Sequence, residues 1–109
     1  MAVMYRVNMS DFSVREEPFE GSQYESLGGR GLTSMLVADE VPPQCHALAA
    51  ENKLIIAPGV LTGTGAPCAG RLSIGAKSPL TGTIKESNSG GQGALALADL
   101  GIKAIVIEG

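Results

Sequence analysis

The sequence predicts an α+β fold in which a β-rich sheet, or more than one, carries about two helices, and in which residues 1–109 form a single domain. Several short segments alternate apolar and polar residues or are wholly apolar, which is typical of strands. Two further segments space their apolar residues at helical intervals. A chain of 109 residues is also long enough to enclose one hydrophobic core.

The first 18 residues are predicted to form a β-hairpin. Residues 4–9 alternate apolar and polar side chains, residues 12–17 return as a second strand, and Ser10-Asp11 supply the turn between them. Pro18 ends the second strand, because proline has no backbone N–H to donate to a sheet.

The first helix is predicted over residues 32–39. Glycines at positions 28, 29 and 31 are expected to interrupt any helix before that point. The prolines that follow Val41 stop the helix at its other end. One face of this helix is expected to point into the core through three apolar side chains: Leu32, Met35 and Leu36.

Four more strands are predicted downstream. Residues 53–57 form a short strand that is apolar after Lys53, so this strand is expected to be covered on both faces. Residues 71–75 alternate, residues 83–87 form a polar and exposed strand, and residues 103–108 form a final buried strand.

A second helix is predicted over residues 92–100, with Gly101 as its C-terminal stop. Its inward side chains are expected to be Leu95, Ala96 and Leu100. Its start, Gly91–Ala96, fits the G-x-G-x-x-A form of the dinucleotide fingerprint. That fingerprint requires a buried apolar strand before the glycines, and residues 83–87 are polar. A nucleotide-binding domain is therefore kept only as an alternative.

Composition excludes several classes of function. The net charge of -3 gives no support to nucleic-acid binding, and no apolar run approaches the length of a membrane span. No apolar segment follows the N-terminus as a secretory signal would require, so a cytoplasmic location is expected. Cys45, His46 and Cys68 cannot complete a zinc or iron–sulfur ligand set within this chain.

The most informative stretch is residues 71–91, which carries two cations and ends in Asn88-Ser89-Gly90-Gly91. If Arg71 opens a strand and Lys77 ends it, both share a face and both could meet a phosphate. The loop before the second helix could offer free N–H groups to an anion. The same residues could equally be two solvated cations and an N-cap at Asn88 or Ser89.

Arg30 is a further candidate, because it lies among glycines that leave room for a ligand. Its guanidinium could bind a carboxylate or a phosphate through two parallel hydrogen bonds. It could equally pair with Glu25 or Asp39 of this chain.

Taken together, these segments resemble the N-terminal part of the tungsten-containing aldehyde ferredoxin oxidoreductases. Each match is weak alone, but all occur in the order and spacing of that family. The matching stretches are Tyr5–Ser10, Leu27–Leu32, Glu51–Ala57, Leu61–Pro67, Lys77–Gly82, Asn88–Gly91 and Ile105–Gly109.

The resemblance implies a β-rich base that holds a tungsten or molybdenum bis-pterin cofactor, in an enzyme that oxidises aldehydes to carboxylic acids with ferredoxin as electron acceptor. Arg71, Asn88 and Gly90 occupy positions where the family contacts the pterin, with Gly91 and Lys77 as neighbouring candidates. The backbone of Asn88 would help to hold a magnesium ion that bridges the cofactor phosphates. No catalytic residue is expected in this chain.

The sequence also departs from that family's pattern. The family's N-terminal domain is pseudo-duplicated, and this chain resembles only its first half, without the cysteines of the [4Fe–4S] cluster. A fragment, a truncated product or a small separate subunit is therefore expected, whose partner is the remainder of the enzyme or a second copy of the chain. The alternative is a free-standing structural module that self-associates and binds no cofactor.

Overall fold

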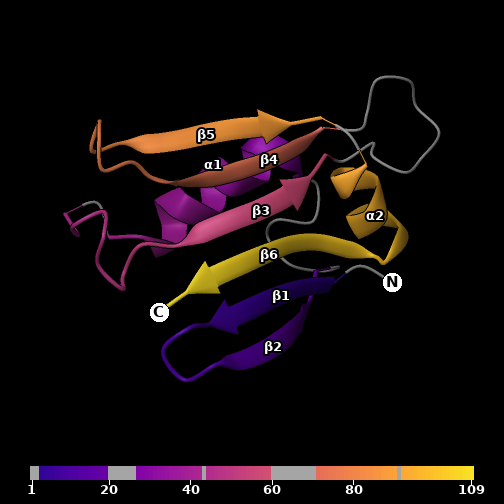
Figure 1. Cartoon of the computed structure of the whole chain (residues 1–109), viewed down its shortest axis with the longest axis horizontal. Helices are drawn as coiled ribbons and strands as arrows, with labels where there is room; N and C mark the ends of the chain where they lie inside the picture. The colour runs from indigo at the N-terminus through magenta and orange to yellow at the C-terminus, as the bar shows by residue number, and fades with distance from the viewer. Residues whose placement is uncertain (1–2, 20–26, 43, 60–70, 91) are drawn as a thin grey trace.

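The computed structural model describes residues 3–19, 27–42, 44–59, 71–90 and 92–109. This part of the chain contains six strands and two helices (Figure 1). In chain order they are β1 (Val3–Asn8), β2 (Ser13–Pro18), α1 (Gly29–Glu40), β3 (Leu54–Pro58), β4 (Leu72–Lys77), β5 (Ile84–Ser89), α2 (Gly93–Asp99) and β6 (Ile102–Glu108). The predicted α+β class is confirmed.

All six strands belong to one sheet, in the order β2-β1-β6-β3-β4-β5. The strands β1 and β2 form the predicted antiparallel hairpin, and β4 and β5 form a second one. The last strand, β6, lies in the middle, parallel to β1 and antiparallel to β3. It therefore joins the two hairpin regions into one sheet.

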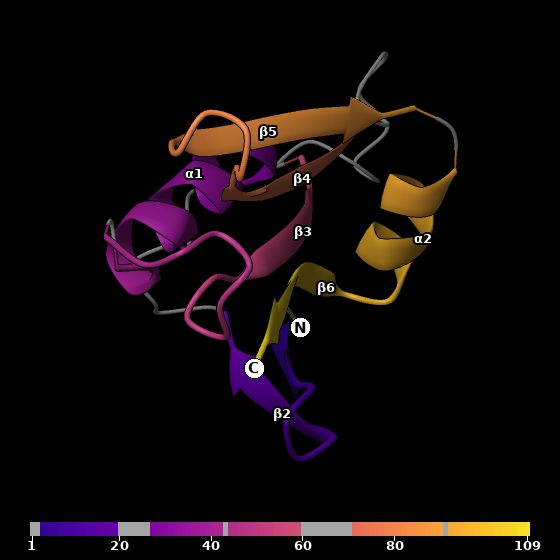
Figure 2. The ribbon, with the colours of Figure 1, turned by 60° about the vertical axis from the view of Figure 1, so that its left-hand side comes forward.

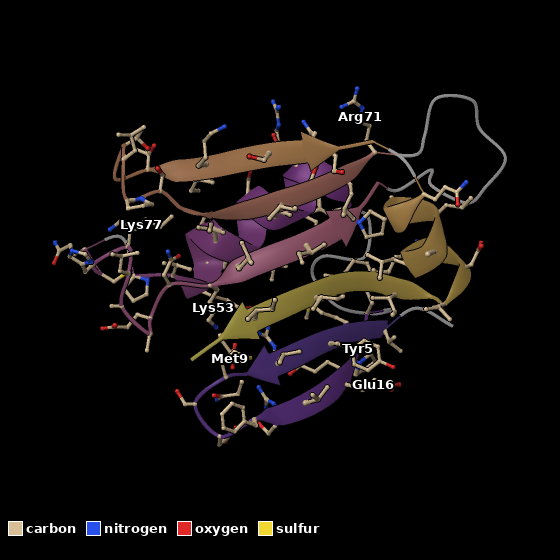
Figure 3. All side chains as sticks on the ribbon, viewed as in Figure 1. Tyr5, Met9, Glu16, Lys53, Arg71 and Lys77 are labelled. Atoms are coloured by element: carbon tan, nitrogen blue, oxygen red, sulfur yellow. The ribbon has the colours of Figure 1, made fainter. Side chains whose placement is uncertain are left out.

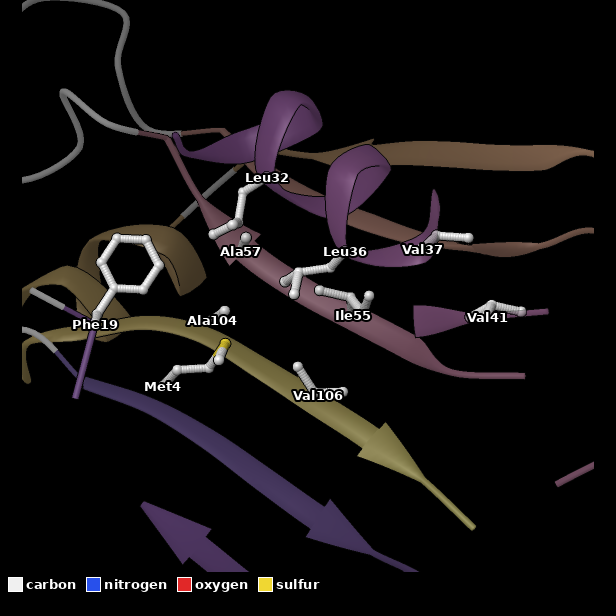
Figure 4. Close-up of a cluster of buried hydrophobic side chains, with 10 residues drawn as sticks. All are labelled: Met4, Phe19, Leu32, Leu36, Val37, Val41, Ile55, Ala57, Ala104 and Val106. Atoms are coloured by element: carbon white, nitrogen blue, oxygen red, sulfur yellow. The ribbon is translucent and has the colours of Figure 1, made fainter. Parts of the chain in front are cut away.

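The hydrophobic core lies between one face of the sheet and α1 (Figure 2). Strands β1, β3 and β6 supply alternate side chains to it, and α1 covers them (Figure 4). The buried members are Met4, Phe19, Leu32, Leu36, Val37, Val41, Ile55, Ala57, Ala104 and Val106.

The start and the inner face of α1 differ from prediction. The helix begins at Gly29, whose φ of +56° glycine adopts at little cost, so the glycines start the helix instead of interrupting it. Met35 is 45% exposed, whereas Thr33 is fully buried. The reason is Gly75 on β4: a Cβ there would lie 2.8 Å from the Cβ of Thr33. This glycine lets α1 approach the sheet through Thr33.

The prediction of the inner face of α2 was also wrong. Leu95, Ala96 and Leu100 are exposed, and Ala94 is the buried residue of this helix. Apolar residues occupy almost every position of this short helix, so their spacing could not define a face. Its predicted end is confirmed, because Gly101 has a φ of +75°.

The second face of the sheet is only partly covered, which corrects the prediction for residues 53–57. Ile55 and Ala57 are buried, but Leu54 is exposed and Ile56 is half-buried. The reason is that α2 packs mainly against β3 and β6, at one end of the sheet, so that among the described residues no helix covers the rest of this face. We call this surface the open face; its half-buried or exposed apolar residues are Tyr5, Val7, Leu54, Ile56, Ile74, Ile105 and Ile107.

Candidate anion-binding site

Three of the predicted site residues meet at one end of the β4–β5 hairpin. Strand pairing places Leu72 opposite Ser89 and Ser73 opposite Asn88. Arg71 directly precedes β4 and Gly90 directly follows β5, so both lie just beyond the last pair. We call this end of the hairpin, formed by Arg71, Ser73, Asn88 and Gly90, the β4–β5 corner.

Lys77 lies at the other end of β4 (Figure 3). Six residues of strand separate it from Arg71 by about 20 Å, so the prediction that both meet one phosphate is wrong. The Lys77 ammonium donates a hydrogen bond to the carbonyl of Cys45, and the Asn52 side chain bonds both backbone groups of Lys77. Lys77 therefore ties β4 to the loop before β3. Gly91 lies outside the described residues.

Asn88 and Ser89 belong to β5 and not to a loop that caps the next helix. The N-cap residue of α2 is Gln92, which makes no side-chain capping bond. The amide oxygen of Asn88 instead lies 3.0 Å from the hydroxyl of Ser73 on the paired strand. The N-cap alternative is therefore wrong, because strand pairing with β4 continues through residue 89.

The carboxylate of Glu86, which is largely covered, organises the corner on the face that α1 covers. Glu86 accepts hydrogen bonds at its two oxygens, from Arg30 Nε at 2.9 Å and from Ser73 Oγ at 3.0 Å. The Asn88 amide nitrogen lies 3.5 Å from the first of these oxygens. The Glu86 side chain is only 9% exposed, whereas that of Arg30 is 71% exposed. The carboxylate is thus held in place, and the guanidinium faces solvent.

The start of α1 closes the same corner. A Cβ added to Gly29 would lie 3.6 Å from Ser73 Oγ and 3.7 Å from the Cα of Gly59, which follows β3. The beginning of α1 therefore packs against the end of β3 and the beginning of β4. A Cβ added to Gly90 would meet nothing within 4 Å, so the backbone at Gly90 is open to a ligand.

These contacts show what sequence reasoning missed. Arg30 was a candidate, but its partner is Glu86, not Asp39; Glu25 lies outside the described residues. Ser73 and Glu86 were not singled out. The alternation within each strand could have placed Glu86 and Asn88 on one face. The pairing of β5 with β4, which brings Ser73 to them, is a tertiary property.

The structure around α2 does not provide the context of a dinucleotide site. The strand before it, β5, is an exposed edge strand antiparallel to β4, and β5 and β6 are not neighbours in the sheet. A dinucleotide fingerprint requires a buried strand, a helix and a second parallel strand. The nucleotide-binding alternative therefore loses its structural support.

A larger charge cluster lies away from the corner, where β1, β2, β6, the end of α1 and the residue before β3 meet. Arg6 binds both carboxylate oxygens of Glu40, at 2.7 and 2.6 Å, and also Glu17 at 2.8 Å. Lys53 bridges Glu40 and Glu108. The hydrogen bonds from Arg6 lower the pKa of Glu40 to about 2. We call these five residues the Arg6 cluster.

No group of three or more His, Cys, Asp or Glu side chains in the described part of the chain is placed to hold a metal ion. No helix among the described residues is long and apolar enough to cross a membrane.

The corner offers what an anionic, phosphate-bearing group requires. Arg71 is exposed and forms no ion pair with a described residue. Gly90 exposes backbone without obstruction, and the carbonyl oxygens of a strand end suit a hard divalent cation. A cation, an open backbone and a second guanidinium at Arg30 are thus present at one end of the sheet.

Comparison with known proteins identifies relatives along the whole chain. Residues 4–109 match the family described as aldehyde ferredoxin oxidoreductase, N-terminal domain. A tungsten-containing aldehyde ferredoxin oxidoreductase of Pyrococcus furiosus is 46% identical over 105 residues, and that of Thermococcus kodakarensis is 47% identical. Each alignment covers 95% of this chain and 17% of the relative, so the chain spans about a sixth of their length.

A solved structure has the same fold. It is the active site complex BamBC of benzoyl coenzyme A reductase with 1,5-dienoyl-CoA, with a TM-score of 0.91 and 29% sequence identity. The match covers 99% of this chain and 17% of the other chain. In the relatives, this unit is therefore one part of a much longer polypeptide.

Proposed function

The chain belongs to the family of aldehyde ferredoxin oxidoreductase N-terminal domains, and we propose that it holds the phosphate end of a bis-pterin cofactor. The metal of this cofactor is tungsten, with molybdenum as the alternative. The observation that carries this proposal is the convergence of Arg71, Asn88 and Gly90 at the β4–β5 corner, where Gly90 leaves the backbone open.

Each residue has a defined task at that corner. Arg71 supplies a guanidinium that binds phosphate oxygens through two parallel hydrogen bonds. The backbone carbonyl of Asn88 would be a ligand for the magnesium ion that accompanies the cofactor phosphates, since magnesium prefers oxygen ligands. Gly90 and its neighbour Gly91 permit the cofactor to approach the main chain. Lys77 has a structural task at the other end of β4.

When bound, the cofactor supplies the oxidation of an aldehyde to a carboxylic acid, with ferredoxin as electron acceptor. The chain itself contributes binding and orientation. We propose that the [4Fe–4S] cluster and the catalytic groups belong to the remainder of the enzyme, that this remainder is the partner of the chain, and that the assembly works in the cytoplasm.

The test is elemental and fluorescence analysis of the natural protein that contains this sequence, purified without added metal. We expect tungsten or molybdenum, magnesium and the fluorescence of oxidised pterin. Arg71→Ala should lower the pterin content while the circular dichroism spectrum is unchanged, and Arg15→Ala, an exposed arginine on β2, is the matched control. A natural protein without pterin and without either metal would refute the proposal.

A second candidate function is a structural module that self-associates without cofactor. The open face favours it, because Leu54 is exposed and Ile56, Ile74, Ile105 and Ile107 are only half-buried. Sedimentation of the 109-residue chain distinguishes the candidates. A folded chain that stays monomeric at high concentration would exclude self-association.

A further inference from the structure

We propose that Arg30 is a second anion-binding residue of the β4–β5 corner, held by the largely covered carboxylate of Glu86 so that its terminal nitrogens bind a phosphate or pyrophosphate group. The inference rests on the proposed function in assigning an anionic ligand to this corner. It places Arg30 of α1, a separate candidate in the sequence, in the same site as the residues of the β4–β5 hairpin.

The hydrogen bonding of Arg30 leaves its binding edge unused. Nε donates to Glu86 Oε1 at 2.9 Å. A guanidinium has five N–H donors, and the four on its two terminal nitrogens form the fork that fits phosphate oxygens. The structure shows no hydrogen bond from these terminal nitrogens to a described residue, and the side chain is 71% exposed. The fork therefore faces solvent.

The partner of Arg30 is unlike that of an ordinary surface ion pair. In a surface pair both charges are solvated and both side chains move freely. Here the Glu86 side chain is 9% exposed, and its second oxygen accepts a hydrogen bond from Ser73, which is itself buried. A carboxylate fixed from two directions fixes the guanidinium that binds it. Such preorganisation lowers the entropy lost when a ligand binds.

Arg30 and Arg71 lie at the same end of the sheet. Gly29 of α1 packs beside Ser73, which places Arg30 at the beginning of β4. Arg71 is two residues before Ser73, and two residues of strand span about 7 Å. An anion with two phosphate groups is the ligand that two guanidinium groups in this arrangement would bind.

The experiment uses the 109-residue chain with inorganic pyrophosphate as the probe, titrated by calorimetry and followed by amide NMR. Arg30→Ala should reduce the affinity about tenfold, since one charge-assisted pair of hydrogen bonds is lost. Arg30→Lys should recover only part of that loss, because an ammonium lacks the fork. Arg15→Ala, which removes another exposed arginine, should leave the affinity unchanged.

Glu86→Gln tests the positioning role separately. Removing a negative charge next to the site would by itself strengthen anion binding. We expect weaker binding, because the guanidinium loses its fixed partner. Stronger pyrophosphate binding by Glu86→Gln would overturn the positioning role. The whole inference would be overturned if the affinity of Arg30→Ala were within twofold of that of the unmodified chain. It would also be overturned if the unmodified chain bound no pyrophosphate.

The outcomes separate this inference from the proposed function. If the natural protein contains pterin and Arg30→Ala leaves the pyrophosphate affinity unchanged, only the role of Arg30 is refuted. Natural protein without pterin, together with Arg30-dependent pyrophosphate binding, would refute only the bis-pterin assignment.

Discussion

Replacing Arg6 by methionine should destabilise the fold, because Arg6 is the centre of the charge cluster that joins four elements. Its guanidinium binds Glu40 on α1 through two hydrogen bonds and Glu17 on β2 through a third. Glu108 on β6 lies 3.4 Å away. The Arg6 side chain is only 12% exposed, and methionine fills similar space without charge.

The expected loss is about 2–3 kcal/mol in the free energy of unfolding. Removing one partner of a buried ion pair costs about 3–5 kcal/mol, whereas an exposed pair contributes about 0–1 kcal/mol. The cluster lies between these cases, and Lys53 continues to neutralise Glu40 and Glu108, at 2.8 and 3.2 Å. A loss of this size is a large fraction of the stability of a small domain.

The same cluster predicts a pH dependence. The pKa of Glu40 falls from 4.5 to about 2 in the folded chain, chiefly through its hydrogen bonds with Arg6. A depressed carboxyl pKa adds stability that is complete above the unfolded pKa and is lost as the pH falls from 4.5 towards 2. The shift corresponds to at most about 3 kcal/mol, and solvent screening reduces this to about 1–2 kcal/mol.

The assay is urea denaturation followed by circular dichroism at pH 7, 4 and 2.5. The difference between the unmodified chain and Arg6→Met should be largest at pH 7 and shrink as the pH falls. Arg15→Met is the control, because Arg15 is 63% exposed and approaches Glu17 and Glu108 only to 4.0 Å. An Arg6→Met variant within about 0.5 kcal/mol of the unmodified chain at pH 7 would refute the reasoning, as would a difference that does not change with pH.

Three further predictions concern single substitutions. Gly75→Ala should cost about 1–3 kcal/mol in urea denaturation, because its Cβ would lie 2.8 Å from Thr33; a cost near zero would contradict the close packing of α1 on β4. Gly101→Ala should lower stability by about 1 kcal/mol in the same assay, since its φ is +75°, and an unchanged midpoint would contradict this. Arg71→Ala should weaken pyrophosphate binding in calorimetry, whereas Lys77→Met should not, because Lys77 lies at the other end of β4. An equal loss of affinity in both variants would contradict the placement of the anion site at the β4–β5 corner.

Sequence reasoning recovered most of the elements because their signals are local. The hairpin at the N-terminus, the polar strand before the second helix and the stop at Gly101 follow from alternation, turn residues and glycine conformation. The inner faces of the helices did not follow. Thr33 turns inward because Gly75, forty-two residues away, leaves space for it, and no local pattern contains that information.

The candidate site shows the same division. The sequence shows that Arg71, Asn88 and Gly90 lie in one stretch, and its resemblance to a known family assigned them a cofactor. Once the bounds of β4 are known, the length of the strand is enough to place Arg71 and Lys77 at its opposite ends. The pairing of Arg30 with Glu86 could not be predicted, because α1 and β5 meet only through their packing on β4.

By itself, then, the sequence determined the α+β class, the strands and helices and the family, since these depend on periodicity, on glycine and proline, and on short motifs in a fixed order. Only the tertiary structure decided the strand order, with β6 between β1 and β3, the open face, and the corner where a largely covered Glu86 holds Arg30. The physical reason is that burial and ion pairing depend on residues far apart in the chain, whose distances are set when the whole sheet forms around α1.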